Sequence, residues 1–126
     1  MDNKGQSLVA FIFILPIIIL ILLVIIDYGQ ISIQKQETIS SVKDIITYAL
    51  RNNDANNREN EMKNLLYKNI DESKVNTLDI EIADNKVTVN IIVIPNEVFN
   101  VLNIHNNIKL SYVGKIENNQ IIIEES

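Results

Sequence analysis

Residues 8 to 26 form an apolar run that no charged side chain interrupts, and only seven residues precede it. At about 1.5 Å of rise per residue, a helix of this length covers roughly 28 Å, the thickness of one bilayer core. Backbone polar groups must be paired in lipid, so the run has to be helical there. We therefore predict a short leader at residues 1–7, a transmembrane helix at 8–26 and one extracytoplasmic domain at 27–126.

Two other interpretations of this run fit less well. A core helix is one such interpretation, but a helix of a globular domain normally shows a polar stripe, whereas this run is apolar on every face. A cleaved secretory signal usually has an apolar segment of about 7–15 residues, followed by a cleavage site of small residues. The run is longer than that, and the junction Ile26-Asp27-Tyr28-Gly29 contains no such site. Retention in the membrane is therefore favoured.

The charges beside the run predict its orientation. The N-terminal amine and Lys4 lie on the short side, while the far side begins with Asp27 and has no basic residue before Lys35. Positive charge next to a span tends to stay in the cytoplasm. We expect a single-pass protein of the cytoplasmic membrane, with its N-terminus inside and its domain outside.

The charge balance of the domain restricts its partners. Asp2 and Lys4 are the charged residues before the run, so ten Lys/Arg and fifteen Asp/Glu follow it, and the domain carries the net charge of −5. Nucleic acids are bound by basic patches, so we expect no nucleic-acid partner. The chain has no cysteine, so disulfides and thiolate metal sites are excluded. About a hundred residues suffice for one modest core.

Helical spacing continues beyond the apolar run. Apolar residues at intervals of three and four predict that the anchor helix extends to about residue 51. The Asn-rich segment 52–57 ends it, and a second, shorter helix is expected from about Arg58 to Asn69. The apolar positions of the two helices are Ile39, Val42, Ile45, Ile46, Ala49 and Leu50, then Met62, Leu65, Leu66 and Ile70.

From Val75 the apolar period changes to two, which is typical of half-buried strands. We predict strands from Val75, over 87–94, over 108–116 and over 121–123, with turns at 84–86 and 117–120. Residues 96–103 are assigned a helical turn with Val98, Val101 and Leu102 inward. The fold class is α+β: a transmembrane helix continuing into a long amphipathic helix, a short helix, then a small antiparallel sheet of three or four strands.

Residues for catalysis or metal binding are sparse. The one histidine, His105, lies in a polar segment, and no serine or threonine has the setting of an activated nucleophile. Asp79, Glu81 and Asp84 offer oxygen ligands of the kind that Ca²⁺ prefers, but their spacing matches no calcium loop. An ordinary solvated strand face is the better interpretation. We predict no catalytic residue, no cofactor and no metal site.

The N-terminal motif is more specific. Lys4-Gly5 precedes the apolar run, Leu15-Pro16 lies about ten residues further on, and Asp27-Tyr28-Gly29 closes it. This pattern resembles the TadE/TadG-like pseudopilins of the tight-adherence (Flp) pilus, a type IV pilus-like secretion system. The likeness in organisation covers the whole chain, whereas the specific motifs lie within residues 4–29. The resemblance implies a pilin-like fold and partners among pilin-like subunits and an inner-membrane platform.

The resemblance also implies processing by a prepilin peptidase between Gly5 and Gln6. Five residues after the glycine, the family commonly has a glutamate that pairs with the new amine of a neighbouring subunit, and this chain has Ala10. Loss of that carboxylate leaves a buried amine unpaired, which weakens packing in a fibre. The departure therefore favours a minor or stationary subunit over a major fibre pilin.

Two functions of different classes remain open. The first is a structural subunit of a tight-adherence pilus or related secretion apparatus. The second is a single-span, membrane-tethered binding or sensing domain with no role in a pilus. A tethered enzyme is the weakest option because the chain lacks the residues described above. Processing separates the first two, since a pseudopilin is cut near Gly5 and a simple anchor keeps Met1.

Overall fold

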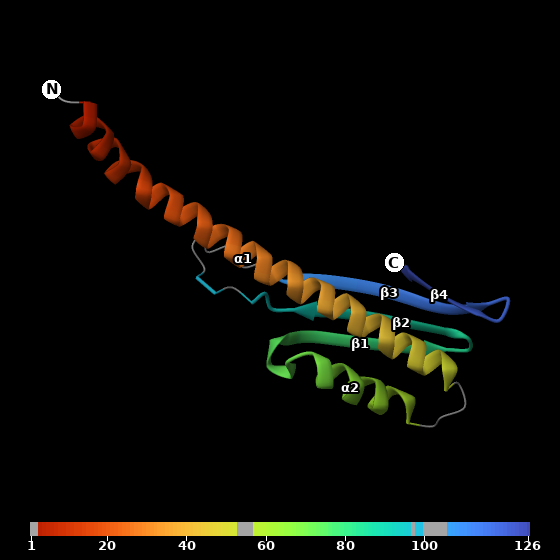
Figure 1. Ribbon diagram of the computed structural model, residues 1–126. Helices are drawn as coiled ribbons and strands as arrows, with labels where there is room; N and C mark the ends of the chain where they lie inside the picture. The colour runs from red at the N-terminus through yellow and green to blue at the C-terminus, as the bar shows by residue number, and fades with distance from the viewer. Residues whose placement is uncertain (1–2, 53–56, 97, 100–105) are drawn as a thin grey trace. The chain divides into compact units, whose positions relative to one another are not determined.

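The computed structural model describes residues 3–52, 57–96, 98–99 and 106–126. Helix α1 runs without a break over Asn3–Arg51 and helix α2 over Arg58–Asn69, and a short 3-10 turn, η1, follows at Glu72–Lys74. The strands are β1 (Val75–Ala83), β2 (Lys86–Val93), β3 (Ile108–Glu117) and β4 (Gln120–Glu125). The predicted α+β class and element order are confirmed (Figure 1).

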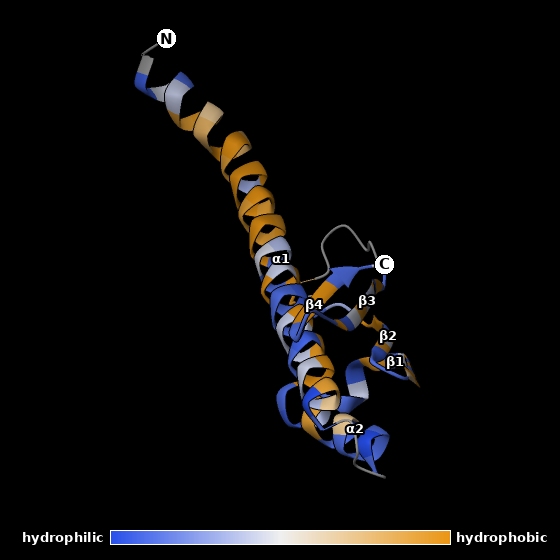
Figure 2. Ribbon diagram, turned by 90° about the vertical axis from the view of Figure 1, so that its right-hand side faces the viewer, coloured by the Kyte–Doolittle hydropathy of each residue, from blue (hydrophilic) through white to orange (hydrophobic). Residues whose placement is uncertain are grey.

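The chain divides into two compact units. One comprises residues 1–32 with 96–104, and the other comprises residues 33–95 with 105–126. The second unit contains the C-terminal part of α1, helix α2 and the sheet. Figures 1 and 2 both show these two helices covering the same face of the sheet, so this unit has two layers.

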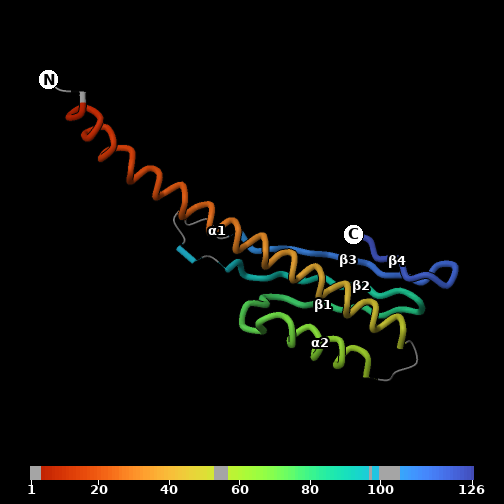
Figure 3. Tube along the Cα trace, viewed as in Figure 1, coloured from red at the N-terminus to blue at the C-terminus, as the bar shows by residue number. Residues whose placement is uncertain are grey.

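Within the described residues the strands form one antiparallel sheet in the order β1-β2-β3-β4, so each strand pairs with its neighbour in sequence. The β1–β2 and β3–β4 hairpins can be followed along the tube in Figure 3. The β3–β4 turn has positive φ at both central residues, Asn118 (53°) and Asn119 (63°). That geometry suits a tight two-residue hairpin, and asparagine adopts it more readily than most residues. Asparagine therefore supplies both central residues of this turn.

The core lies between the sheet and the two helices. The alternate residues of β2 that face inward are fully or almost fully buried, as the period of two predicts. Gly114 lies on the same face of β3, where a side chain would collide with Ile46 of α1, so the absence of one permits close packing of helix and strand. The buried apolar residues are Val42, Ile45, Ile46, Ala49, Leu50, Met62, Leu66, Ile70, Val87, Val89, Ile91, Val93, Ile108, Leu110 and Tyr112.

Differences from the predicted boundaries are small, apart from the segment after β2. Strand β2 covers Lys86–Val93 instead of 87–94, because the N–H of Ile94 donates to the carbonyl of Lys74, outside the ladder. The inward position predicted for Val98 is wrong: its side chain is 58% exposed and the chain bends there. Val101, Leu102 and His105 lie outside the described residues.

Candidate functional site

The N-terminal half of α1 is the most unusual surface of the first unit. Among the described residues, α1 is the one helix long and apolar enough to cross a membrane. Its apolar side chains are uncovered on all sides, with Phe13 73% and Leu8 61% exposed. Figure 2 shows the apolar colour along this part of the helix, interrupted by one pale blue patch. Soluble proteins seldom expose apolar patches this large, so the surface is suited to lipid or to other apolar helices.

The motif residues from Lys4 to Gly29 all lie on α1. The Gly5–Gln6 junction is in the first helical turn, where the N–H groups have no carbonyl partner four residues back. Ala10 is exposed, and so is Leu15 at 40%. Pro16 lies within the helix, which continues on both sides of it. These residues share an element but form no enclosed site.

Asp27 is the exception among the motif residues, because it is 8% exposed and bound to a distant segment. Its Oδ1 accepts hydrogen bonds from the backbone N–H groups of Val98 and Phe99, both at 2.9 Å. Its neighbours Tyr28 and Gly29 are exposed, and the helix passes through Gly29 without ending. The sequence motif includes Asp27 but does not indicate this partner segment. The one available signal was an acidic residue directly after the span.

A second run of polar residues lies deeper in α1, within the second unit. Gln34, Thr38 and Ser41 are all buried. The Nε2 of Gln34 donates to the carbonyl of Ile94 at 2.8 Å, and the hydroxyl of Thr38 donates to the carbonyl of Gln34. The Gln34 bond joins the helix to the chain just after β2. A buried amide with a partner is tolerated in a core and fixes the register of the elements it connects.

The face of the sheet that points away from the helices carries most of the polar residues of the strands. Asp79 and Glu81 are exposed there, as the alternation predicted, and Asp84 is exposed in the following turn. Ser111 is hydrogen-bonded to Asn90 and to Ser126 on the same face. A shallow hollow of about 300 Å³ lies beside them. Within the part of the chain that the structure describes, no three His, Cys, Asp or Glu residues group as a metal site would require.

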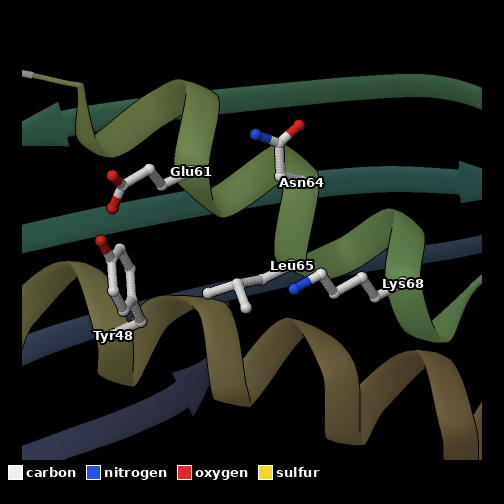
Figure 4. Close-up of a pocket in the computed structure, with 5 residues that line it drawn as sticks. All are labelled: Tyr48, Glu61, Asn64, Leu65 and Lys68. Carbon is white, nitrogen blue, oxygen red and sulfur yellow. The ribbon is translucent and has the colours of Figure 1, made fainter.

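A further hollow, of about 250 Å³, lies between α1 and α2. Figure 4 shows Tyr48 from α1 facing Glu61 and Leu65 of α2, with Asn64 and Lys68 alongside. The hollow combines a phenol, a carboxylate, an amide and an amine around one leucine. Such a set can form hydrogen bonds with a polar group, but it contains no nucleophile paired with a base.

One further charged contact connects the two layers. The Nζ of Lys43 on α1 lies 5.8 Å from the centre of the ring of Tyr112 on β3, within the range of a cation–π interaction. Tyr112 is 8% exposed and belongs to the core. The lysine amine lies over the face of its ring. This contact stabilises the packing of helix on sheet and has no evident chemical role.

Comparison with known proteins adds no relative. No protein-family model matches this chain, no curated protein does, and no solved structure does.

Proposed function

We propose that this protein is a membrane-anchored structural or assembly subunit, pseudopilin-like and minor, of a tight-adherence pilus or related secretion apparatus. The observation that carries the proposal is the difference between the two halves of α1. Its N-terminal half exposes apolar side chains all round, and its C-terminal half supplies core residues to a two-layer α+β domain. This is the layout of a pilin-like subunit. The Lys4-Gly5, Leu15-Pro16 and Asp27-Tyr28-Gly29 motifs support it.

In this proposal the span has two partners. A uniformly apolar helix can lie in the bilayer or pack against similar helices along a fibre axis. The positive leader keeps the N-terminus in the cytoplasm, where an inner-membrane platform and a prepilin peptidase would meet it. The acidic domain stands outside the cell membrane. Protease added to protoplasts should then degrade the domain and leave the span, whereas protection until lysis would contradict this orientation.

Processing at Gly5–Gln6 is the direct test of the pseudopilin assignment. The full chain is expressed with a prepilin peptidase, and its intact mass is measured from isolated membranes. We expect the loss of residues 1–5, which the variant Gly5→Leu should abolish and the control Ser7→Ala should not. A full-length chain in the presence of an active peptidase would favour the alternative, a membrane-tethered binding or sensing domain.

Ala10 provides a test of the minor role. If the missing carboxylate keeps this subunit out of the body of a fibre, the native protein should be abundant in membranes and rare in sheared filaments. A carboxylate at the centre of a bilayer costs about 2.5–3.5 kcal/mol, and two residues inside the boundary it costs less. Ala10→Glu should therefore still insert, with unchanged or increased incorporation into filaments. Ala10→Gln is the uncharged control. Finding the native protein as the dominant filament component would overturn the minor-subunit role.

A further inference from the structure

The contact between Asp27 and the segment after β2 joins residues about seventy positions apart. Asp27 is the first residue after the apolar run, so in a bilayer it marks the end of the span. One carboxylate oxygen holds two successive backbone N–H groups, those of Val98 and Phe99. Hydrogen bonds to a carboxylate are shorter and stronger than those between neutral groups, and here the carboxylate is buried. The backbone of these two residues is therefore held at the level of the end of the span.

The side chains of the same two residues are left uncovered. Val98 is 58% exposed and Phe99 is 48% exposed, although both are apolar. Beside Asp27 in the helix, Ile26 is 44% and Tyr28 is 62% exposed. Tyrosine rings gather at this depth in membrane proteins, and interfacial segments bury phenylalanine and other apolar side chains at the boundary between headgroups and acyl chains. The exposed side chains of the segment thus have the composition of the span's own end.

We propose that Val98 and Phe99 form a second membrane contact, which inserts into the boundary between headgroups and acyl chains where the span emerges. Asp27 is its positioning residue. Lipid is the occupant because the segment is tied to the residue that directly follows the apolar run. Insertion also leaves no cost at the two backbone N–H groups, since the carboxylate already satisfies them. The inference rests on membrane insertion of α1 and not on a role in a pilus.

Fluorescence can test this contact in the full chain, which contains no tryptophan. Phe99→Trp is reconstituted in phosphatidylcholine–phosphatidylglycerol vesicles that contain lipids brominated at defined depths. Phe13→Trp reports the interior of the span, and Ile122→Trp, on the sheet face away from the helices, is the aqueous control. We expect blue-shifted emission from Phe99→Trp and several-fold stronger quenching by shallow bromolipids than for the control. Emission and iodide quenching equal to those of Ile122→Trp would overturn the proposal.

Two substitutions at Asp27 test its positioning role on the Phe99→Trp background. Asp27→Ala should release the segment and reduce quenching by bromolipids to the level of the control. Asp27→Asn keeps an oxygen acceptor, so it should retain most of the quenching. Phe13→Trp verifies in each case that the span still inserts. Undiminished quenching in Asp27→Ala would overturn the role of Asp27. A blue shift that increases with protein density, without quenching by bromolipids, would overturn the lipid contact and indicate contact with a second copy of the chain. Either failure leaves the processing test of the proposed function unaffected.

Discussion

Gly114→Ala is expected to destabilise the domain, although glycine is a poor residue for the interior of a strand. A Cβ at residue 114 would collide with Cγ2 of Ile46 and lie 3.1 Å from Cδ1 of Leu50. The Cγ2 of a β-branched helix residue cannot rotate away, because one χ1 rotamer dominates there. An extra carbon in a well-packed core costs about 1–3 kcal/mol. Replacement of a strand glycine by alanine returns about 0.5–1 kcal/mol of this through the unfolded chain.

With the midpoints of these two ranges, the net loss of stability is about 1.25 kcal/mol, which corresponds to a fall in Tm of about 5–10 °C for a domain of this size. The assay is thermal unfolding of the full chain in detergent, followed by circular dichroism. Gly29→Ala is the matched control, since nothing lies within 4 Å of a Cβ there. It should be neutral or stabilise helix α1.

A double-mutant cycle identifies the clash as the cause. Ile46→Ala alone leaves a cavity and should cost about 2–5 kcal/mol. In the double variant the new Cβ of residue 114 no longer meets Cγ2, so its added cost should vanish or change sign. Strictly additive effects of the two substitutions would refute the close packing of Ile46 on residue 114. A Gly114→Ala protein as stable as the native one would refute it as well.

Three other outcomes follow from the structure. Leu66→Ala, at a fully buried position of α2, should lower the free energy of unfolding by about 2–5 kcal/mol. Leu65→Ala, at the half-buried neighbouring position, should lower it clearly less. Equal losses of the two variants in denaturant titrations would contradict the burial pattern. The hydroxyl and the backbone N–H of Ser73 both donate to the carboxylate of Asp71. These bonds, and to a smaller extent the charge of Lys74, hold the pKa of Asp71 below its ordinary value. Ser73→Ala should therefore raise the pKa of Asp71, which an NMR titration measures. The stabilisation from these bonds is present above the ordinary pKa of an unfolded aspartate and is lost as the pH falls through the lower pKa of the folded state. The free energies of unfolding of the variant and the native protein should therefore differ least in strong acid.

The elements themselves could be predicted because their signals are local. The spacing of Met62, Leu66 and Ile70 predicts a helix wherever the segment lies, and the alternation in β2 predicts a strand with one buried face. Turn chemistry is equally local, since asparagine at positions 118 and 119 tolerates positive φ. The boundaries of α2 agree with the prediction at both ends because Asn-rich residues precede it and the 3-10 turn follows closely.

The candidate site was predicted only in part, because its decisive contacts are distant in sequence. Asp27 was assigned to a motif, but its hydrogen bonds to Val98 and Phe99 join residues about seventy positions apart, a distance over which periodicity carries no signal. The same holds for Val98, which was expected inside on helical spacing and is exposed instead. Periodicity assigns a residue to a face of a regular element, and this segment bends instead of continuing one.

The sequence alone determined the class of this protein: a long apolar helix near the N-terminus, a second helix and a meander of strands, each specified by composition and period. Only the tertiary structure decided which residues of α1 meet the sheet, why residue 114 has no side chain, and what the carboxylate of Asp27 holds. The physical reason is the range of the forces concerned. Hydrophobic period and turn propensity act within a few residues, whereas close packing and hydrogen bonds between remote segments exist only once the chain has folded.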